Sequence, residues 1–225
     1  MKIILFFLFS LFVLTACGSN DQLSTPIDTL WSQKIILALG DSLTSWYWLS
    51  EEDSYPSQLQ KKLKENGYDY LVQNAGISGD TSAGLLSRID WILDSDDSTS
   101  SGNTTPFEFA ILCIGANDAF QGKSPEDIEN NIRVIIEKLQ AKKIPILFAG
   151  MKAPLNLGGE YGRQYEAIFP RLAKEYNLVY MNFFLEWVAL KASLNQEDRI
   201  HPTREGYTVV VDNLMKILER DFLQK

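Results

Sequence analysis

The chain has 225 residues, with 21 lysines and arginines against 29 aspartates and glutamates, which gives a formal net charge of −8. This length predicts one domain, or two small ones, and the apolar fraction of 45% is typical of a folded core. The acidic balance excludes the basic surface of a nucleic-acid-binding protein, two cysteines exclude a disulfide scaffold, and one histidine excludes a metal site with several histidine ligands.

The first residues have the pattern of a targeting segment. Lys2 precedes an apolar run at 3–14, which has the length of a signal-peptide core and is too short to cross a bilayer as a helix. The run ends in LTAC, whose last residue is Cys17. This sequence resembles a bacterial lipobox, in which the cysteine is lipidated and becomes the mature N-terminus. A plain signal peptide with an incidental cysteine is the alternative.

The lipoprotein interpretation divides the chain into three parts. Residues 1–16 are then a signal peptide, residues 17–33 are the lipidated Cys17 and a polar tether of at most about 50 Å, and residues 34–225 are the folded domain. The resemblance implies a membrane-anchored protein on the periplasmic side, and Gly18 favours the outer membrane. Cys113 lies in the apolar run FAILCI and is expected in the core, so we expect no disulfide.

Apolar runs and amphipathic segments alternate along the folded domain. Apolar runs predict five strands, at residues 34–39, 70–74, 107–115, 144–150 and 178–183. Helical spacing predicts helices at residues 55–66, 85–93, 128–139, 161–176 and 207–218. Because the strands are apolar almost throughout and helices separate them, we expect a parallel sheet covered on both faces. The polar segment 94–106 predicts a solvated loop.

Two prolines mark expected helix starts. Ser124 and Pro125 suit the cap and first turn of the helix at 128–139. Pro202 suits the first turn of the last helix, and this would leave His201 at the entrance of that helix.

Polar motifs fall at turns on the edge where parallel sheets bind ligands. Ser42 ends GDS after the first strand and can be held exposed for attack, although such a tripeptide is usually a turn. The segment NAGISGDT at 74–81 offers N–H groups beside a helix start, and the amide of Asn117 after the third strand can donate to an oxyanion. Asp198 lies three residues before His201 and can reach its imidazole in a tight turn. Each feature alone is common in loops; their combination points to catalysis.

These segments together resemble the sequence blocks of the SGNH (GDSL) hydrolases, in the same order. The closest resemblance is to the arylesterase, thioesterase and lysophospholipase group. It is carried by GDSLT, NAGISGDTSAGLL, GANDAF, YGRQYEAIFPRLAKEYNLVYMNFF and HPTREGY, and it spans residues 34–220. The resemblance implies a flavodoxin-like three-layer α/β/α sandwich with a mainly parallel five-stranded sheet.

The resemblance also implies a role for each matching residue. Ser42 is the nucleophile, His201 the general base and then acid, and Asp198 the residue that orients His201. The N–H groups of Ser42 and Gly79 and the side-chain amide of Asn117 form the oxyanion hole. No metal and no cofactor is implied.

The chain departs from its relatives in places. The third block reads GAND where many relatives have GGND, so Ala116 replaces a glycine. The sequence SWYW at residues 45–48 follows the first block, and its aromatic rings either line a pocket or shape its mouth, or they cover the helix below. Asp41 and Asp118 lie within the motifs and are interpreted as structural.

The implied activity is hydrolysis of acyl esters or thioesters, with lysophospholipids and other ester lipids as the leading substrates. Pro154, Leu155 and Leu157 follow the fourth strand and are candidates for acyl-chain selection, unless the segment is an ordinary connection. The first alternative function is an esterase that removes O-acetyl groups from glycans. The second is a surface-binding lipoprotein without activity, against which the complete set of catalytic residues argues.

Overall fold

The protein is described by a computed structural model that covers residues 34–94 and 107–223. The predicted signal peptide, Cys17, the tether and the loop at 95–106 lie outside the described residues. None of the described helices is both long enough and apolar enough to cross a membrane.

Five parallel strands form the sheet. They are β1 (Lys34–Gly40), β2 (Tyr70–Gly76), β3 (Phe107–Cys113), β4 (Ile146–Ala149) and β5 (Val179–Met181). Their order across the sheet is β2-β1-β3-β4-β5, and all four neighbouring pairs are parallel. The predicted parallel α/β sheet is therefore confirmed, with strand ends that differ from the expected ones by a few residues.

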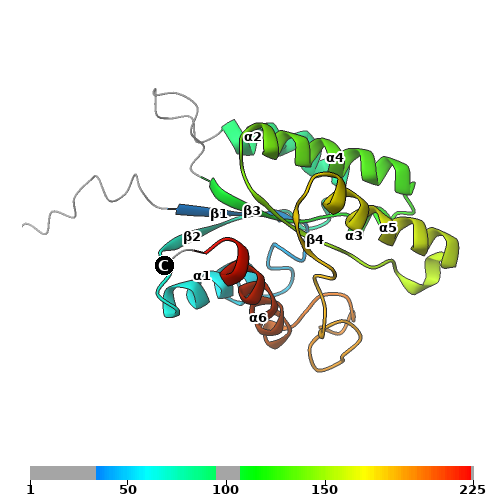
Figure 1. The fold of residues 1–225 in the computed structure, drawn as a ribbon. Coiled ribbons are helices and arrows are strands. Elements are labelled where there is room, and N and C mark those ends of the chain that lie inside the picture. The colour runs from blue at the N-terminus through cyan, green and yellow to red at the C-terminus, as the bar shows by residue number, and fades with distance from the viewer. Residues whose placement is uncertain (1–33, 95–106, 224–225) are drawn as a thin grey trace, which may run out of the picture. The chain divides into compact units, whose positions relative to one another are not determined.

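Helices cover both faces of the sheet, as Figure 1 shows. One layer contains α1 (Tyr55–Glu65) and α6 (Arg204–Asp221), and the other contains α2 (Ser82–Asp94), α4 (Pro125–Ala141) and α5 (Gly159–Glu175). Short helical turns complete the chain: η2 (Glu51–Asp53), α3 (Ala116–Phe120) and η3 (Leu155–Leu157). The fold is the expected three-layer sandwich; α3 was not expected from the sequence.

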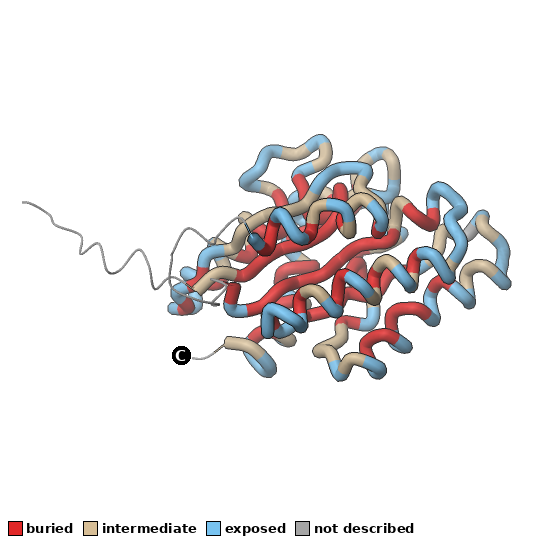
Figure 2. Tube along the Cα trace, turned by 90° about the horizontal axis from the view of Figure 1, so that it is seen from above, coloured by how far each residue is buried: buried red, intermediate tan, exposed pale blue. Residues whose placement is uncertain are grey.

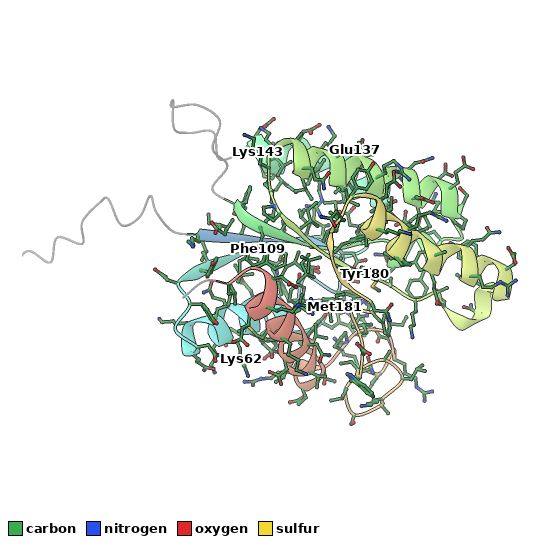
Figure 3. The ribbon with its side chains drawn as sticks, in the orientation of Figure 1. Lys62, Phe109, Glu137, Lys143, Tyr180 and Met181 are labelled. Atoms are coloured by element: carbon green, nitrogen blue, oxygen red, sulfur yellow. The ribbon has the colours of Figure 1, made fainter. Side chains whose placement is uncertain are left out.

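The core lies between the sheet and the two helical layers. Figure 2 shows continuous burial along the central strands and alternating burial along the helices around them. Aromatic rings join the layers: Phe148 of β4 lies 5.6 Å from Phe169 of α5, and Phe109 of β3 lies 4.5 Å from Phe222 (ring centroids). Figure 3 labels Phe109 where the sheet meets the layer of α1 and α6.

Side-chain caps explain where the helices begin. Ser124 accepts a hydrogen bond from the N–H of Asp127, and Pro125 occupies the first turn of α4, as expected. The expectation for Pro202 was wrong. The last helix is capped by Thr203, whose hydroxyl accepts the N–H of Gly206, so Pro202 precedes the helix.

Pro202 instead has a role in the loop before α6. It forms an isolated antiparallel bridge with the buried Asn195, and the N–H of Thr203 donates to the carbonyl of Leu194. His201 therefore lies in a loop that is tied back on itself, and its position does not depend on a helix end.

The register of the sheet aligns three strand ends. Gly40 at the end of β1 lies opposite Gly76 of β2 and Cys113 of β3. A Cβ at Gly40 would lie 2.1 Å from the Thr44 hydroxyl and 2.5 Å from the Cys113 carbonyl, and one at Gly76 would lie 2.5 Å from the backbone N of Ser45. Glycine is required at both ends because the turns after these strands pack directly against each other.

Candidate active site

A tight turn after β1 presents Ser42. The Asp41 carboxylate accepts the N–H of Leu43 at 2.9 Å, and the Asp41 carbonyl accepts the N–H groups of Thr44 and Ser45. The turn is thus held from both sides of Ser42, whose side chain lines a cleft although the residue is only 8% exposed.

Ser42, His201 and Asp198 form a connected triad. The Ser42 Oγ lies 2.8 Å from His201 Nε2, and His201 Nδ1 lies 2.6 Å from Asp198 Oδ2. With Nδ1–H donating to the carboxylate, Nε2 is left to accept the proton of the Ser42 hydroxyl. The three residues that the sequence nominated therefore meet with the geometry of a serine nucleophile and its base.

Asp198 is bound as a charged group. Its other oxygen, Oδ1, accepts the backbone N–H groups of Ile200 at 2.9 Å and His201 at 3.0 Å. Burial raises the pKa of Asp198, but the hydrogen bonds from the His201 ring and from these N–H groups outweigh it and hold the pKa below its ordinary value. Asp198 is therefore ionised at neutral pH and stabilises the imidazolium that forms when His201 accepts a proton.

Gln196 fixes the loop that carries the triad pair, and it was not found from the sequence. Its side-chain amide donates to the carbonyls of Tyr47 at 3.1 Å and Pro202 at 3.0 Å, and its N–H donates to the carbonyl of His201 at 2.8 Å. Gln196 thus links the loop after Ser42 to the loop of His201. A glutamine in a polar loop has no distinctive sequence signal.

Three hydrogen-bond donors are the expected members of the oxyanion hole: the N–H groups of Ser42 and Gly79 and the side-chain amide of Asn117. Asn117 follows Gly115, whose φ of +116° turns the chain out of β3, and its amide donates to the Asp80 carbonyl at 2.8 Å. This bond fixes the amide and leaves its second N–H for an oxyanion. Within the described part of the chain, the N–H groups of Ser42 and Gly79 donate to no protein acceptor.

Two buried or partly buried carboxylates hold the loops after β2 and β3 in place. Asp118 accepts the hydroxyl of Ser82 at 2.6 Å and its N–H at 2.8 Å, which ties α3 to the start of α2. Asp80 accepts Arg88 Nε at 2.8 Å, and the same guanidinium donates to the Gly40 carbonyl at 3.3 Å. The structural role expected for Asp118 agrees with these contacts, whereas the pair of Asp80 and Arg88 was missed.

The aromatic rings at residues 46–48 do not line the cleft, but one of them packs beside it on His201. The Tyr47 ring packs on the His201 imidazole with centroids 4.3 Å apart, and Trp48 stacks on Tyr47 at 5.1 Å and 14°. Trp46 and Trp48 are exposed, and none of these rings lines the cleft. Tyr47 therefore covers one face of the catalytic base and limits the positions its ring can take.

A largely apolar cleft of about 840 Å³ opens beside the triad. Ser42, Asn117 and His201 lie in its wall. The buried or partly buried apolar part of the wall comes from several elements: Leu43, Ala116, Met151, Phe183 and Leu185. The volume is in the range of sites that enclose most of a small organic ligand.

The segment after β4 contributes to the cleft in part. Pro154 lies in the wall, as expected. Leu157 instead packs against the hydrophobic core and does not line the cleft, because η3 turns it inward. The side chain of Leu155 lies outside the described part of the structure. Within residues 34–94 and 107–223, no group of three or more His, Cys, Asp or Glu side chains is placed to hold a metal ion.

Asp41 gives a testable link between the site and stability. Burial raises the pKa of Asp41 from 3.8 to about 7. The hydrogen bond from the Leu43 N–H lowers this pKa, whereas the nearby charges of Asp80 and Asp118 raise it. Between these pH values the folded state holds a proton that the unfolded state releases, so Asp41 makes the fold less stable as pH rises. Asp41→Asn keeps an oxygen for the Leu43 N–H and removes the titration. We expect the free energy of unfolding in urea to fall less from pH 4 to pH 7 in this variant than in the wild type.

The matched control is Asp69→Asn, which changes an exposed carboxylate just before β2. Its slope should follow the wild type. Equal slopes for Asp41→Asn and the wild type would contradict the buried, protonated state of Asp41.

Comparison with known proteins agrees with this geometry. Residues 38–209 match the family described as GDSL-like Lipase/Acylhydrolase. The thioesterase 1/protease 1/lysophospholipase L1 of Escherichia coli strain K12 is 32% identical over 184 residues, which cover 82% of this chain and 83% of that protein. The arylesterase of Vibrio mimicus is 34% identical over 171 residues, covering 76% and 81%.

A solved structure gives the same result in three dimensions. The esterase EstA of Pseudoalteromonas sp., in a crystal structure inhibited by monoethylphosphonate, superposes with a TM-score of 0.76 and 28% identity over 84% of this chain and 98% of that one. The family match at residues 38–209 includes Ser42, Asn117 and His201. The chain is a member of the GDSL-like lipase/acylhydrolase family, and it is an ester-bond hydrolase.

Proposed function

We propose that the enzyme hydrolyses fatty acyl esters of lipids, with lysophospholipids as the leading class. The observation that carries this proposal is the apolar cleft beside Ser42, because a fatty acyl chain gains free energy by leaving water for such a wall. One relative carries lysophospholipase and thioesterase in its name, and this supports the same choice.

The triad geometry supports a two-step mechanism. Ser42 Oγ attacks the ester carbonyl carbon while His201 Nε2 takes its proton, and Asp198 stabilises the resulting imidazolium. The carbonyl oxygen becomes an oxyanion that accepts hydrogen bonds from the N–H groups of Ser42 and Gly79 and from the Asn117 amide. His201 then gives its proton to the departing alcohol, or thiol in a thioester. Water attacks the acyl-enzyme with His201 again as base, which releases the acid and restores Ser42.

An O-acetyl esterase acting on glycans is the second candidate. It uses the same triad, and polar cleft residues such as Asn156 and Glu166 could contact a sugar. An acetyl group, however, would leave most of the apolar wall in contact with water, so the cleft favours a longer chain.

The first test is the hydrolysis of soluble p-nitrophenyl esters of increasing chain length, with the wild type beside Ser42→Ala. We expect kcat/KM to rise from the acetyl to the medium-chain esters, because each added methylene can be buried against the cleft wall, and we expect Ser42→Ala to abolish turnover. A strict preference for the acetyl ester would favour the glycan esterase. Turnover that survives Ser42→Ala would contradict the acyl-enzyme mechanism.

The oxyanion hole gives a second prediction. Asn117→Ala removes one donor to the transition state, and kcat should fall about 10²–10³-fold with little change in KM. The control is Asn66→Ala, which changes an exposed amide at the end of α1 and should retain wild-type kinetics. Urea unfolding of both variants would show whether the fold is kept. A wild-type kcat in Asn117→Ala would remove Asn117 from the oxyanion hole.

We further propose that the enzyme is a lipoprotein anchored through Cys17 on the periplasmic side, in the outer membrane. The supporting evidence is the LTAC sequence after an apolar run of signal-peptide length, with Gly18 after the cysteine. Metabolic labelling with a radioactive fatty acid in a bacterial host is expected to label the wild type and to leave Cys17→Ser unlabelled. Equal labelling of the two proteins, or none of the wild type, would contradict the anchor.

A further inference from the structure

Exposed apolar side chains gather at the mouth of the catalytic cleft. Ten large apolar side chains of the described residues are substantially exposed, and four of them line this cleft. We call these four the lip: Phe120, Trp187, Leu190 and Ile200. Single exposed apolar residues are ordinary in soluble proteins, but a group gathered around a binding cleft marks an interaction surface.

The lip is built from three separate segments. Phe120 ends α3, Trp187 and Leu190 lie in the turns that follow β5, and Ile200 precedes the catalytic His201. Figure 1 draws the segment between β5 and α6 as orange loops. Trp187 is 65% exposed and Leu190 85% exposed, so most of their surface faces solvent.

Two of the lip residues have a left-handed backbone conformation, which costs stability in residues other than glycine. The φ angle is +67° at both Trp187 and Leu190 and +60° at Arg199, which also lines the cleft. Lys143 and Asn177 have positive φ angles too, but they follow the ends of α4 and α5, where the left-handed conformation is usual. Trp187 and Leu190 lie in the turns after β5, away from any helix end, and Trp48, which does not line the cleft, has a φ of +54° in another turn. Strained conformations of this kind persist where the surroundings enforce them and concentrate at functional sites.

Lysine side chains accompany the aromatic rings near the cleft. Lys191 Nζ lies 5.8 Å from the centroid of the Trp187 ring, and Lys152 Nζ lies 4.9 Å from that of Phe183. Tryptophan with adjacent lysine is the pairing found where proteins meet a lipid–water interface, because the ring enters the apolar boundary while the ammonium stays with the headgroups.

The charges of the cleft wall are mixed. Lys152 and Arg199 are balanced there by Glu166 and Glu186. This arrangement contrasts with the net charge of −8 of the whole chain and spares the mouth of the cleft from strong repulsion by lipid phosphates. It suits headgroups that carry both a phosphate and an ammonium.

We infer that the lip is a docking surface for a phospholipid aggregate, a bilayer or a micelle, into which Trp187 and Leu190 insert. This inference rests on the proposed lipid-ester activity. Because the lip lines the cleft that contains Ser42, an acyl chain can pass from the lipid into the cleft along apolar side chains. The lip thereby selects substrate that is presented at a surface.

The test uses the full-length protein bound to phosphatidylcholine vesicles, with and without bromine on the acyl chains. Bromine quenches the fluorescence of tryptophans that contact the acyl region. Trp187→Phe removes a reporter but keeps an aromatic ring in the lip, and the bromine-dependent quenching should fall by about a third or more. The matched control is Trp91→Phe, which changes a tryptophan on α2 that is 75% exposed and lies outside the cleft. The fluorescence intensity that this variant loses to bromine should equal the intensity that the wild type loses.

A second variant tests insertion while keeping the reporter. Leu190→Asp places a charge in the lip and keeps Trp187. It should lower the bromine-dependent quenching of tryptophan fluorescence, because the charge opposes insertion of Trp187 into the acyl region. Equal quenching in the wild type, Trp187→Phe and Leu190→Asp would overturn the docking role of the lip. Hydrolysis of p-nitrophenyl butyrate by the same wild-type sample separates the two proposals. If the enzyme hydrolyses the ester but the lip variants do not lower the quenching, only the docking role of the lip is overturned. If the lip variants lower the quenching but the enzyme hydrolyses no ester, the proposed function is overturned and the lip remains a lipid-binding surface.

Discussion

The catalytic site depends on the register of three parallel strands. Gly40 lies opposite both Gly76 and Cys113, so the turns that follow β1, β2 and β3 start from one line. The proposed nucleophile Ser42 and the proposed oxyanion donors Gly79 and Asn117 follow these strand ends, and glycine at Gly40 and Gly76 lets the turns approach closely. The sheet alone thus brings together groups that are distant in sequence. Only the general base requires a further element, the loop before α6.

Two aspartates in this site have opposite pKa shifts, and their surroundings explain the difference. Asp198 is partly exposed and accepts hydrogen bonds from a ring nitrogen and two backbone N–H groups, which favour its charged form. Asp41 is fully enclosed and accepts one backbone N–H, so its neutral form is favoured. Asp198 stabilises charge on His201, whereas Asp41 shapes the turn.

Local patterns predicted most of the fold. Apolar runs located the five strands, helical spacing located the long helices, and the capping pair at Ser124 and Pro125 was correct because each of these signals is contained in a short segment. The errors arose where distant contacts decide the outcome. Pro202 pairs with Asn195 instead of starting a helix, and Leu157 packs into the core because of how η3 turns. The packing of Tyr47 on His201 joins segments about 150 positions apart, and no local pattern encodes it.

The separation of the triad along the chain has a consequence for biosynthesis. Ser42 follows the first strand, whereas its base lies 159 positions later, in the loop that precedes the last helix. A growing polypeptide therefore contains its nucleophile long before it contains the group that activates it. Until the final loop has been synthesised and has docked against the turn after β1, the chain has no working serine. The enzyme is thus silent during translation and in any unfolded state of the chain.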